Sequence, residues 1–132
     1  VIIPLGRLAN FTNGELFGRI TDLPLGVVFE GVDQHLRHPS QIYEAVAEGP
    51  LILLIMYVFS RKRNFIKNQT PGIFAAKYII IYCILRFFVE FTREPDAFLG
   101  FIGPWEVLTL GQVLCLIFLL SGLIFFRKLK HN

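Results

Sequence analysis

The sequence contains few of the residues that build metal, redox and nucleotide sites. Among its 132 residues are 2 cysteines, 3 histidines and 1 tryptophan. Cys83 and Cys115 form no CxxC pair, and His35 and His38 have no further set of ligands at metal-binding spacing. The glycine-rich fingerprints of nucleotide-binding loops do not occur either. We therefore expect neither a metal nor a cofactor, and we interpret both cysteines as small buried hydrophobic residues.

Charged residues are also scarce. They make up 17% of the sequence, and the formal net charge is +3. The basic residues gather at the ends of apolar segments, whereas nucleic-acid sites interleave them with aromatic side chains in one patch. We therefore do not expect a nucleic-acid partner.

Long apolar segments dominate the composition. The sequence is 54% hydrophobic, with a mean hydropathy of +0.57. A helix needs about 20 mostly apolar residues to cross a bilayer, and residues 40–60, 72–92 and 106–126 form three such segments. The sequence predicts an all-α integral membrane protein with about three transmembrane helices, all within residues 39–132.

Residues 1–38 differ from the rest. From Gly6 onward they mix glycine, asparagine and charged residues with no sustained helical or strand period, which predicts a loop-rich head outside the membrane. The apolar residues before Gly6 are expected to be the end of a span that begins before the sequence given. Within the head, Asn13-Gly14 predicts a turn and Val27–Phe29 a short strand.

The distribution of charge predicts the orientation in the membrane. The basic run Arg61–Arg63 and Lys67 follow the first span, and three more basic residues follow the third, so the positive-inside rule places both ends in the cytoplasm. The loop between the second and third spans contains Asp96 and Glu106 and is expected outside, with Trp105 as an interface anchor. The head would then lie at the outer leaflet.

The second predicted span carries charged residues on one face. Tyr82, Arg86, Glu90 and Arg93 fall within an arc of roughly 80° on a helix. A charge at this depth costs about 2.5–3.5 kcal/mol on insertion scales and usually faces a cavity or a partner. Two arginines against one acid leave a positive excess, which favours an anionic ligand such as a lipid phosphate. Alternatively, Glu90 neutralises Arg86 as an i,i+4 pair and Arg93 extends to the headgroups.

The first span carries a second polar face. Gln41, Glu44 and Glu48 follow one another at helical spacing, with Gln41 placed to reach back to the start of the helix as a cap. Pro50 should kink the helix just after Glu48. At 1.5 Å per residue, Glu48 and Arg86 reach a similar depth, so we expect them to face one cavity.

The third span offers weaker signals. Thr109 and Gln112 are candidates to extend the same polar cavity. Gly111 and Cys115 form a small-xxx-small pair, which is typical of close helix packing.

Three motifs resemble a known family. They are GRLANFTNGE at Gly6–Glu15, RHPSQIYE at Arg37–Glu44 and RFFVEFTREPD at Arg86–Asp96. In this order they resemble the bacterial prolipoprotein diacylglyceryl transferases. The resemblance covers essentially the whole chain, which would correspond to the carboxy-terminal part of the family's seven-span bundle.

The resemblance implies a reaction and a location. Enzymes of this family transfer the diacylglyceryl group of phosphatidylglycerol to the thiol of a lipobox cysteine in a prolipoprotein, which forms a thioether and releases glycerol phosphate. The expected partners are phosphatidylglycerol, the lipobox peptide and membrane lipids. The expected location is the bacterial cytoplasmic (inner) membrane, as a multi-pass protein with its active face toward the outer leaflet.

The resemblance also implies roles for individual residues. The family's essential arginines match Arg7 and Arg86, and cations suit a reaction in which negative charge grows on a departing phosphate. The positions that match the family's substrate-binding signature are Arg7, Asn10, Gly14, Glu15, Gly18, Glu90 and Arg93. Residues expected to line the cavity are His38, Glu44, Glu48 and Tyr82.

The base that would activate the thiol stays open. A cysteine thiol has a pKa of about 8.5 and must lose its proton to attack. His38 is a local candidate, although its place at a helix start fits a capping role better. The family's usual candidate is a histidine in a His-Gly-Gly motif, which this sequence does not contain. Alternative hypotheses are a lipid- or anion-binding transport module and a non-catalytic fragment.

Overall fold

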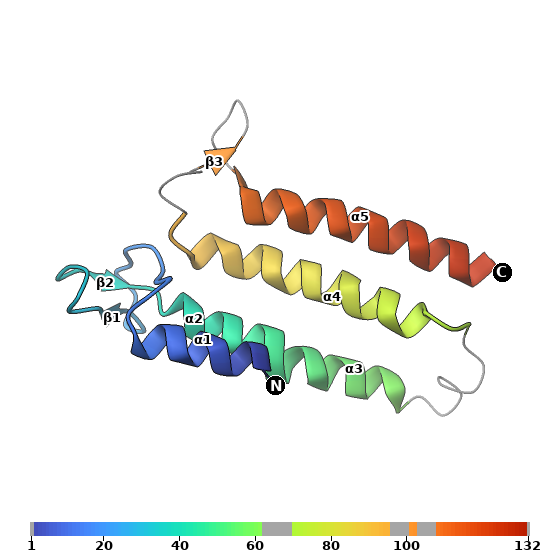
Figure 1. The fold of residues 1–132 in the computed structure, drawn as a ribbon, viewed down its shortest axis with the longest axis horizontal. Helices are drawn as coiled ribbons and strands as arrows, with labels where there is room; N and C mark the ends of the chain where they lie inside the picture. The colour runs from blue at the N-terminus through green and yellow to red at the C-terminus, as the bar shows by residue number, and fades with distance from the viewer. Residues whose placement is uncertain (1, 62–69, 96–100, 103–107, 132) are drawn as a thin grey trace.

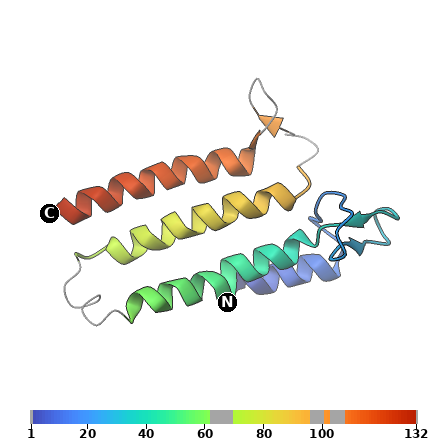
Figure 2. The same cartoon turned by 180° about the vertical axis from the view of Figure 1, so that it is seen from behind.

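Three long helical segments lie side by side and alternate in direction (Figures 1 and 2). The computed structural model describes residues 2–61, 70–95, 101–102 and 108–131. The first segment consists of α2 (Ser40–Val46), a π-helical turn (Ala47–Leu51) and α3 (Ile52–Ser60); the second of α4 (Ile73–Val89) and a 3-10 turn (Glu90–Thr92); and the third of α5 (Leu110–His131).

Two of these segments have the length and composition of a membrane span. They are Ser40–Ser60 and Leu110–Lys130, with mean hydropathies of 1.7 and 2.1. The first matches the predicted span at 40–60, whereas the third helix begins at Leu110 and not at residue 106. The middle helix α4 has 17 residues, near the lower limit of about 17 for a span. Its crossing of the membrane stays a prediction.

The predicted loop from Gly6 onward is wrong for its first seven residues. Helix α1 covers Ile2–Thr12 and packs along α2 and the π-helical turn. Glycine, asparagine and threonine lower its intrinsic helix propensity, but tertiary packing overrides propensity. A Cβ at Gly49 would meet the ring of Pro4, so the missing side chain lets α1 approach closely.

The remaining head matches the loop-rich prediction. Strands β1 (Val27–Val28) and β2 (Leu36–Arg37) form a short antiparallel pair, which confirms the predicted strand at Val27. Asn13 and Gly14 form the predicted turn, with Gly14 at a φ of +68°. A second pair, β3 (Phe101–Ile102) and β4 (Leu108–Thr109), precedes α5.

Backbone contacts join the head to the segment that follows the C-terminal end of α4. Gly18 forms an antiparallel bridge with Arg93, and the N–H of Arg19 donates to the carbonyl of Thr92 at 3.0 Å. A Cβ at Gly18 would collide with the carbonyl oxygens of His38 and Thr92. Glycine is therefore required where three segments cross.

The apolar core is small, and most large apolar side chains face outward. Buried positions include Ile52 and Met56 on α3 and Ala76 and Cys83 on α4. Cys83 and Cys115 are free thiols and buried, as predicted. Many leucines and phenylalanines of the long helices are more than half exposed. Such large apolar faces mark contact with a membrane or another protein.

Of the two predictions made for the first long helix, the one about its middle is confirmed and the one about its start is wrong. Pro50 was expected to disturb the helix after Glu48, and the π-helical turn at Ala47–Leu51 confirms this. The predicted side-chain cap is wrong, because Pro39 occupies the cap position and no side-chain cap hydrogen bond forms. Gln41 instead donates its amide to the carbonyl of Glu15 at 2.6 Å.

Candidate functional site

Two arginines from different helices meet at one carboxylate. The Nε of Arg7, on α1, lies 2.8 Å from Oε2 of Glu44, and Nη1 of Arg86, on α4, lies 2.8 Å from Oε1 of the same residue. Glu44 is on α2, and its side chain is 3% exposed. The two predicted catalytic residues are therefore brought together, although 79 positions separate them in sequence (86 minus 7).

A second carboxylate, Glu48, lies one helical turn further along. Its oxygens lie 3.6 Å from Nε of Arg7 and 3.7 Å from Nε of Arg86. The hydroxyl of Tyr82 donates to Glu48 at 3.3 Å. Glu48 and Arg86 thus lie at the same depth and in contact, and Tyr82 joins them; that they face one cavity stays a prediction.

A third carboxylate, Glu90, completes the cluster. It lies 2.8 Å from Nη2 of Arg86, which confirms the i,i+4 contact, and Nη1 of Arg93 lies 3.8 Å from Glu44. The expected excess of positive charge is wrong, because it weighed two arginines against Glu90 alone. The ion-pair cluster, as we call this group, has three guanidinium groups and three carboxylates: Arg7, Arg86, Arg93, Glu44, Glu48 and Glu90.

The start of α5 supports this cluster through a capping box. The N–H of Gln112 donates to Oγ1 of Thr109 at 3.3 Å, and the N–H of Thr109 donates to Oε1 of Gln112 at 3.0 Å. This is the reciprocal pattern of a Thr-x-x-Gln capping box. The hydroxyl of Thr109 also donates to Glu90 at 3.0 Å. The carboxylate thus lies at the positive end of the α5 dipole, which stabilises it.

Gly111 explains how Glu90 comes so close to α5. A Cβ at this position would lie 2.8 Å from Oε1 of Glu90. The small residue therefore makes room for a carboxylate as well as for a neighbouring helix. The Thr-x-x-Gln spacing, which the sequence interpretation missed as a helix start, could have located this support.

The arginine side chains of the cluster are more exposed than its glutamate side chains. The side chains of Glu44 and Glu48 are 3% and 1% exposed, whereas Arg7 and Arg93 are 21% and 15% exposed. A guanidinium has five N–H donors in a planar fork. The carboxylates lie on the buried side of the cluster, and the arginine side chains are its more exposed part. An anion such as a phosphate would therefore approach from the side of the arginines.

An apolar groove leads away from Arg86 between α4 and α5. It has a volume of about 530 Å³, and Tyr82 and Arg86 form its polar part. The rest of the lining is mainly apolar and consists of Tyr78, Ile79, Cys83, Gly111, Leu114, Cys115 and Phe118. A guanidinium beside an apolar groove matches a ligand with an anionic group and a hydrocarbon chain.

A second set of charges holds the head in place. Arg37 is buried and lies 2.7 Å from Asp33 and 3.3 Å from Glu94, and it donates to the carbonyl of Gly18 at 3.1 Å. Its guanidinium also lies 4.7 Å from the ring centroid of Phe17. The hydrogen bond from Arg37 lowers the pKa of Asp33 below its ordinary value. The contact with Glu94 joins the head to the segment that follows Arg93, and the others hold Arg37 in place within the head.

Several other predicted site residues lie in the head or at its border. Asn10 is on α1, three residues after Arg7, and its carbonyl accepts a hydrogen bond from the N–H of Glu15 at 2.9 Å. His38 lies 3.5 Å from the hydroxyl of Tyr43, and no contact described for it reaches the cluster. Gly14 and Gly18 have the backbone roles given above.

The predicted orientation depends partly on residues outside the described ranges. These are Lys62, Arg63, Lys67, Asp96, Trp105 and Glu106. Arg61 is described and exposed, as are the basic residues near the end of α5, namely Arg127, Lys128 and Lys130.

Comparison with known proteins gives consistent results. Residues 2–127 match the family model described as prolipoprotein diacylglyceryl transferase. The chain is 47% identical over 120 residues to the phosphatidylglycerol–prolipoprotein diacylglyceryl transferase of Geobacter sulfurreducens, covering 90% of this chain and 43% of the relative. It is 43% identical over 126 residues to the protein of the same name from Rickettsia bellii, covering 92% and 46%.

The chain therefore spans less than half the length of these two curated relatives. The match nevertheless includes almost every residue described above, from α1 through most of α5. The arginine–glutamate cluster and the capping box beside it are thus parts of a chain that belongs to the prolipoprotein diacylglyceryl transferase family.

Proposed function

We propose that this chain provides the phosphate-binding part of an enzyme that transfers a diacylglyceryl group from phosphatidylglycerol to a prolipoprotein cysteine. The observation that carries the proposal is the convergence of Arg7 and Arg86 on Glu44, at 2.8 Å each. The names of the relatives supply the two substrates. The geometry supplies a place where a lipid phosphate can meet two oriented guanidinium groups.

The change of charge during the reaction suits this arrangement. The thiolate sulfur attacks the glyceryl carbon that carries the phosphate, a C–S bond forms, and the C–O bond to phosphate breaks. A phosphodiester with one negative charge becomes a phosphate monoester with about −1.5 to −2 at pH 7. Arg7 and Arg86 therefore interact more strongly with the leaving group than with the bound lipid, and such differential binding accelerates a reaction.

The three carboxylates are positioning residues in this proposal. Glu44 and Glu48 lie on the buried side of Arg7 and Arg86 and fix the planes of both guanidinium groups. Because a guanidinium binds phosphate through a planar fork, its orientation matters as well as its charge. Preorganised groups of this kind need little rearrangement as the reaction proceeds.

We further propose that an acyl chain of the lipid lies in the groove between α4 and α5. The groove starts at Arg86 and continues along apolar side chains such as Leu114 and Phe118. Burial of hydrocarbon stabilises binding by roughly 25 cal/mol per Å². One lipid can therefore place its phosphate at the ion-pair cluster and a chain in the groove.

The orientation of the helices supports a site at the outer leaflet. The end of α3, the start of α4 and the end of α5 lie together, opposite the head (Figures 1 and 2). Arg61 and the basic residues after Phe126 belong to that end. The positive-inside rule favours the cytoplasmic side of a bacterial inner membrane for this end, and we propose that the head and Arg86 lie on the outer side.

The test measures whether a diacylglyceryl group is transferred to a lipobox peptide. The protein is reconstituted in phosphatidylglycerol vesicles, both alone and with the segment of the Geobacter sulfurreducens relative that lies outside the match. The peptide is then analysed by mass spectrometry for a diacylglyceryl adduct on its cysteine. Arg86→Lys keeps the charge and loses the planar fork, so we expect a fall in transfer of about 100-fold or more. Arg61→Lys, at the opposite end, is the matched control.

The outcomes separate the hypotheses. Transfer by the chain alone would place the thiol's base within these residues, with His38 and Glu48 as the first candidates. Transfer that needs the added segment would place the base there and leave Arg7 and Arg86 at the phosphate. If folded protein moves lipid across the vesicle but never modifies the peptide, the transport hypothesis replaces the transferase.

A further inference from the structure

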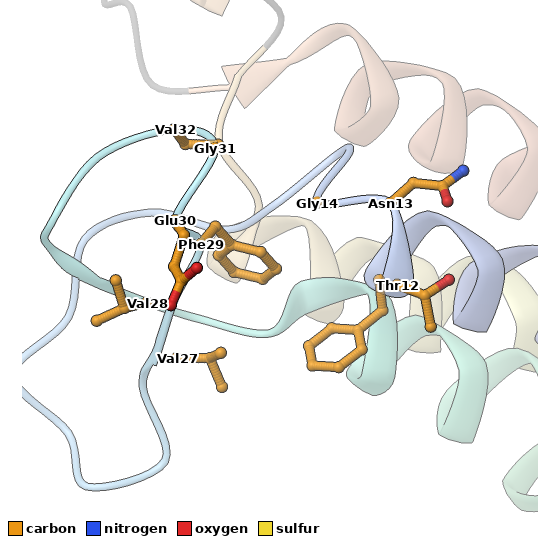
Figure 3. Close-up of a pocket in the computed structure, with 10 residues that line it drawn as sticks. Thr12, Asn13, Gly14, Val27, Val28, Phe29, Glu30, Gly31 and Val32 are labelled. Atoms are coloured by element: carbon orange, nitrogen blue, oxygen red, sulfur yellow. The ribbon is translucent and has the colours of Figure 1, made fainter.

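The head contains a second cavity, separate from the ion-pair cluster (Figure 3). It has a volume of about 450 Å³, which lies within the usual range of about 300–1,000 Å³ for ligand sites. The walls are the end of α1 with the turn that follows, residues 11–14, and the loop of residues 27–32.

The lining of this head cavity contains both apolar residues and uncharged polar residues. Valines from β1 and the loop form one part, and Thr12 and Asn13 border the other. The hydroxyl of Thr12 donates to the carbonyl of Ala9 at 2.8 Å, within α1. The charged residue in the lining is Glu30, an acid. A lipid phosphate is therefore disfavoured in the head cavity, in contrast to the ion-pair cluster, where guanidinium groups are present.

Contacts between aromatic rings join the two walls of the head cavity. Phe29 is buried, and its ring lies 5.8 Å from that of Phe11 in an edge-to-face arrangement and 5.9 Å from that of Phe17. Figure 3 shows the ring of Phe29 between the β1 valines and Thr12. The loop of residues 27–32 is thus fastened to α1 by its own side chain, so the cavity is a preformed feature of the head.

Strand β1 offers backbone groups to an additional strand. In the part of the chain that the structure describes, Val27 and Val28 pair with β2 along one edge only. An extended peptide can add to such an edge through main-chain hydrogen bonds, while its side chains occupy adjacent pockets. Both valines also line the head cavity.

The head cavity also lies close to the proposed reaction site along one helix. Phe11 and Arg7 are four residues apart on α1, a rise of about 6 Å. A peptide segment in the cavity therefore lies beside the helix that carries a phosphate-binding arginine, and two or three extended residues would bridge the distance.

We propose that the head cavity binds an extended, largely uncharged peptide segment, namely the part of the prolipoprotein next to the reacting cysteine. The identity of this peptide rests on the proposed function. The head cavity binds the peptide by valine and phenylalanine contacts and by pairing with β1. The lipid binds separately, at the ion-pair cluster and the groove.

The first test locates the peptide without requiring the reaction. A lipobox peptide whose cysteine is replaced by serine and which carries a photoreactive side chain is crosslinked to the vesicle-reconstituted protein, and the adducts are mapped by mass spectrometry. We expect adducts within residues 11–14 and 27–32. Adducts confined to the long helices would overturn the proposal. So would labelling of the head cavity by a photoreactive phosphatidylglycerol that excess peptide does not displace.

The second test adds a bulky side chain at the wall of the cavity without disturbing the fold. A Cβ at Gly31, which lines the cavity, would have no heavy atom within 4 Å, so Gly31→Trp adds bulk in open space. We expect KM for the peptide to rise about tenfold or more while KM for phosphatidylglycerol stays within about twofold. Leu25→Trp is the matched control, because Leu25 is 69% exposed on the head and lies outside the cavity lining.

The two tests distinguish this inference from the proposed function. Crosslinks in the head cavity without any lipid transfer would retain the peptide site and remove the transferase. Normal transfer with an unchanged peptide KM in Gly31→Trp would retain the transferase and remove the peptide site.

Discussion

The guanidinium of Arg86 and the carboxylate of Glu44 lie 2.8 Å apart and join α4 to α2. Glu44 makes the same contact with Arg7, so one buried carboxylate fixes the relative positions of two helices and two cations. Arginine cannot lose its proton in proteins. Loss of the Glu44 charge therefore removes the shorter of the two carboxylate contacts that Arg7 and Arg86 share, and leaves the longer one to Glu48.

Replacing Glu44 tests this relationship directly. In Glu44→Gln the side chain keeps its shape and loses its charge. Removing one partner of a buried ion pair typically costs about 3–5 kcal/mol, so we expect the free energy of unfolding in a detergent titration to fall by that amount. Misplaced arginines should also lower transfer about 100-fold. Asp22→Asn, an exposed change in the head, is the control, and equal stability of the two variants would contradict the prediction.

Gly18 tests the junction between the head and α4. In Gly18→Ala the new methyl group would collide with the carbonyl oxygens of His38 and Thr92, which are backbone atoms and cannot turn aside. We expect the head to become sensitive to protease while the long helices persist. Gly6→Ala is the counterpart, because nothing lies within 4 Å of its added Cβ and alanine favours α1 by about 1 kcal/mol. Equal protection of the head in both variants would show that the junction tolerates the methyl group.

Thr109 tests the capping box of α5. Thr109→Val keeps the shape of the side chain and removes the hydroxyl that meets both Gln112 and Glu90. Loss of an N-cap costs about 0.5–2 kcal/mol, and Glu90 also loses a hydrogen bond. We expect lower stability and slower transfer, and both should recover in Thr109→Ser. If serine fails to restore them, the methyl group of Thr109 and not its hydroxyl is important.

The attachment of the head should depend on pH through Asp33, because this carboxylate holds Arg37 where it contacts Glu94. Arg37 lowers the pKa of this carboxyl in the folded protein, whereas the unfolded value is about 3.9. The contribution of the contact is therefore complete above about pH 4 and is lost as the pH falls through the lowered pKa of the folded state. Limited proteolysis between pH 7 and pH 3 should show release of the head only at the acid end. Asp33→Asn should show weaker protection at neutral pH and a smaller change with pH.

Sequence periodicity predicted three of the four side chains that it assigned to one face of the second span. The positions of Tyr82, Arg86 and Glu90 follow from spacing alone, and the structure brings all three together. The fourth, Arg93, reaches the cluster from extended backbone after the 3-10 turn, so the helical position predicted for it is wrong. Spacing along the first helix placed Glu44 and Glu48 on one polar face as well. A single-helix argument, however, does not give the number of charges that meet between helices, which is why the predicted positive excess was wrong.

The roles of Arg7 and Arg37 could not be obtained from periodicity. Arg7 lies on α1, whose glycine and asparagine content obscures the helix, and packing on α2 and the π-helical turn stabilises that conformation. Arg37 is buried between Asp33 and Glu94, and the second of these contacts spans 57 positions. The positions of both arginines depend on long-range packing, which local propensity does not contain.

The π-helical turn at Ala47–Leu51 sets the rotational phase of the first long helix. Such a turn contains one residue more than an α-turn, and one residue corresponds to about 100° of rotation. The wide turn absorbs this extra residue, so the two halves of the helix keep the phase that they would have without it. A substitution of Pro50 that turned the segment into regular α-helix at constant length would rotate Glu44 and Glu48 by about 100° relative to Ile52 and Met56. The two carboxylates would then leave the arginines with hydropathy almost unchanged, so the irregular turn, and not apolarity alone, keeps the ion-pair cluster together.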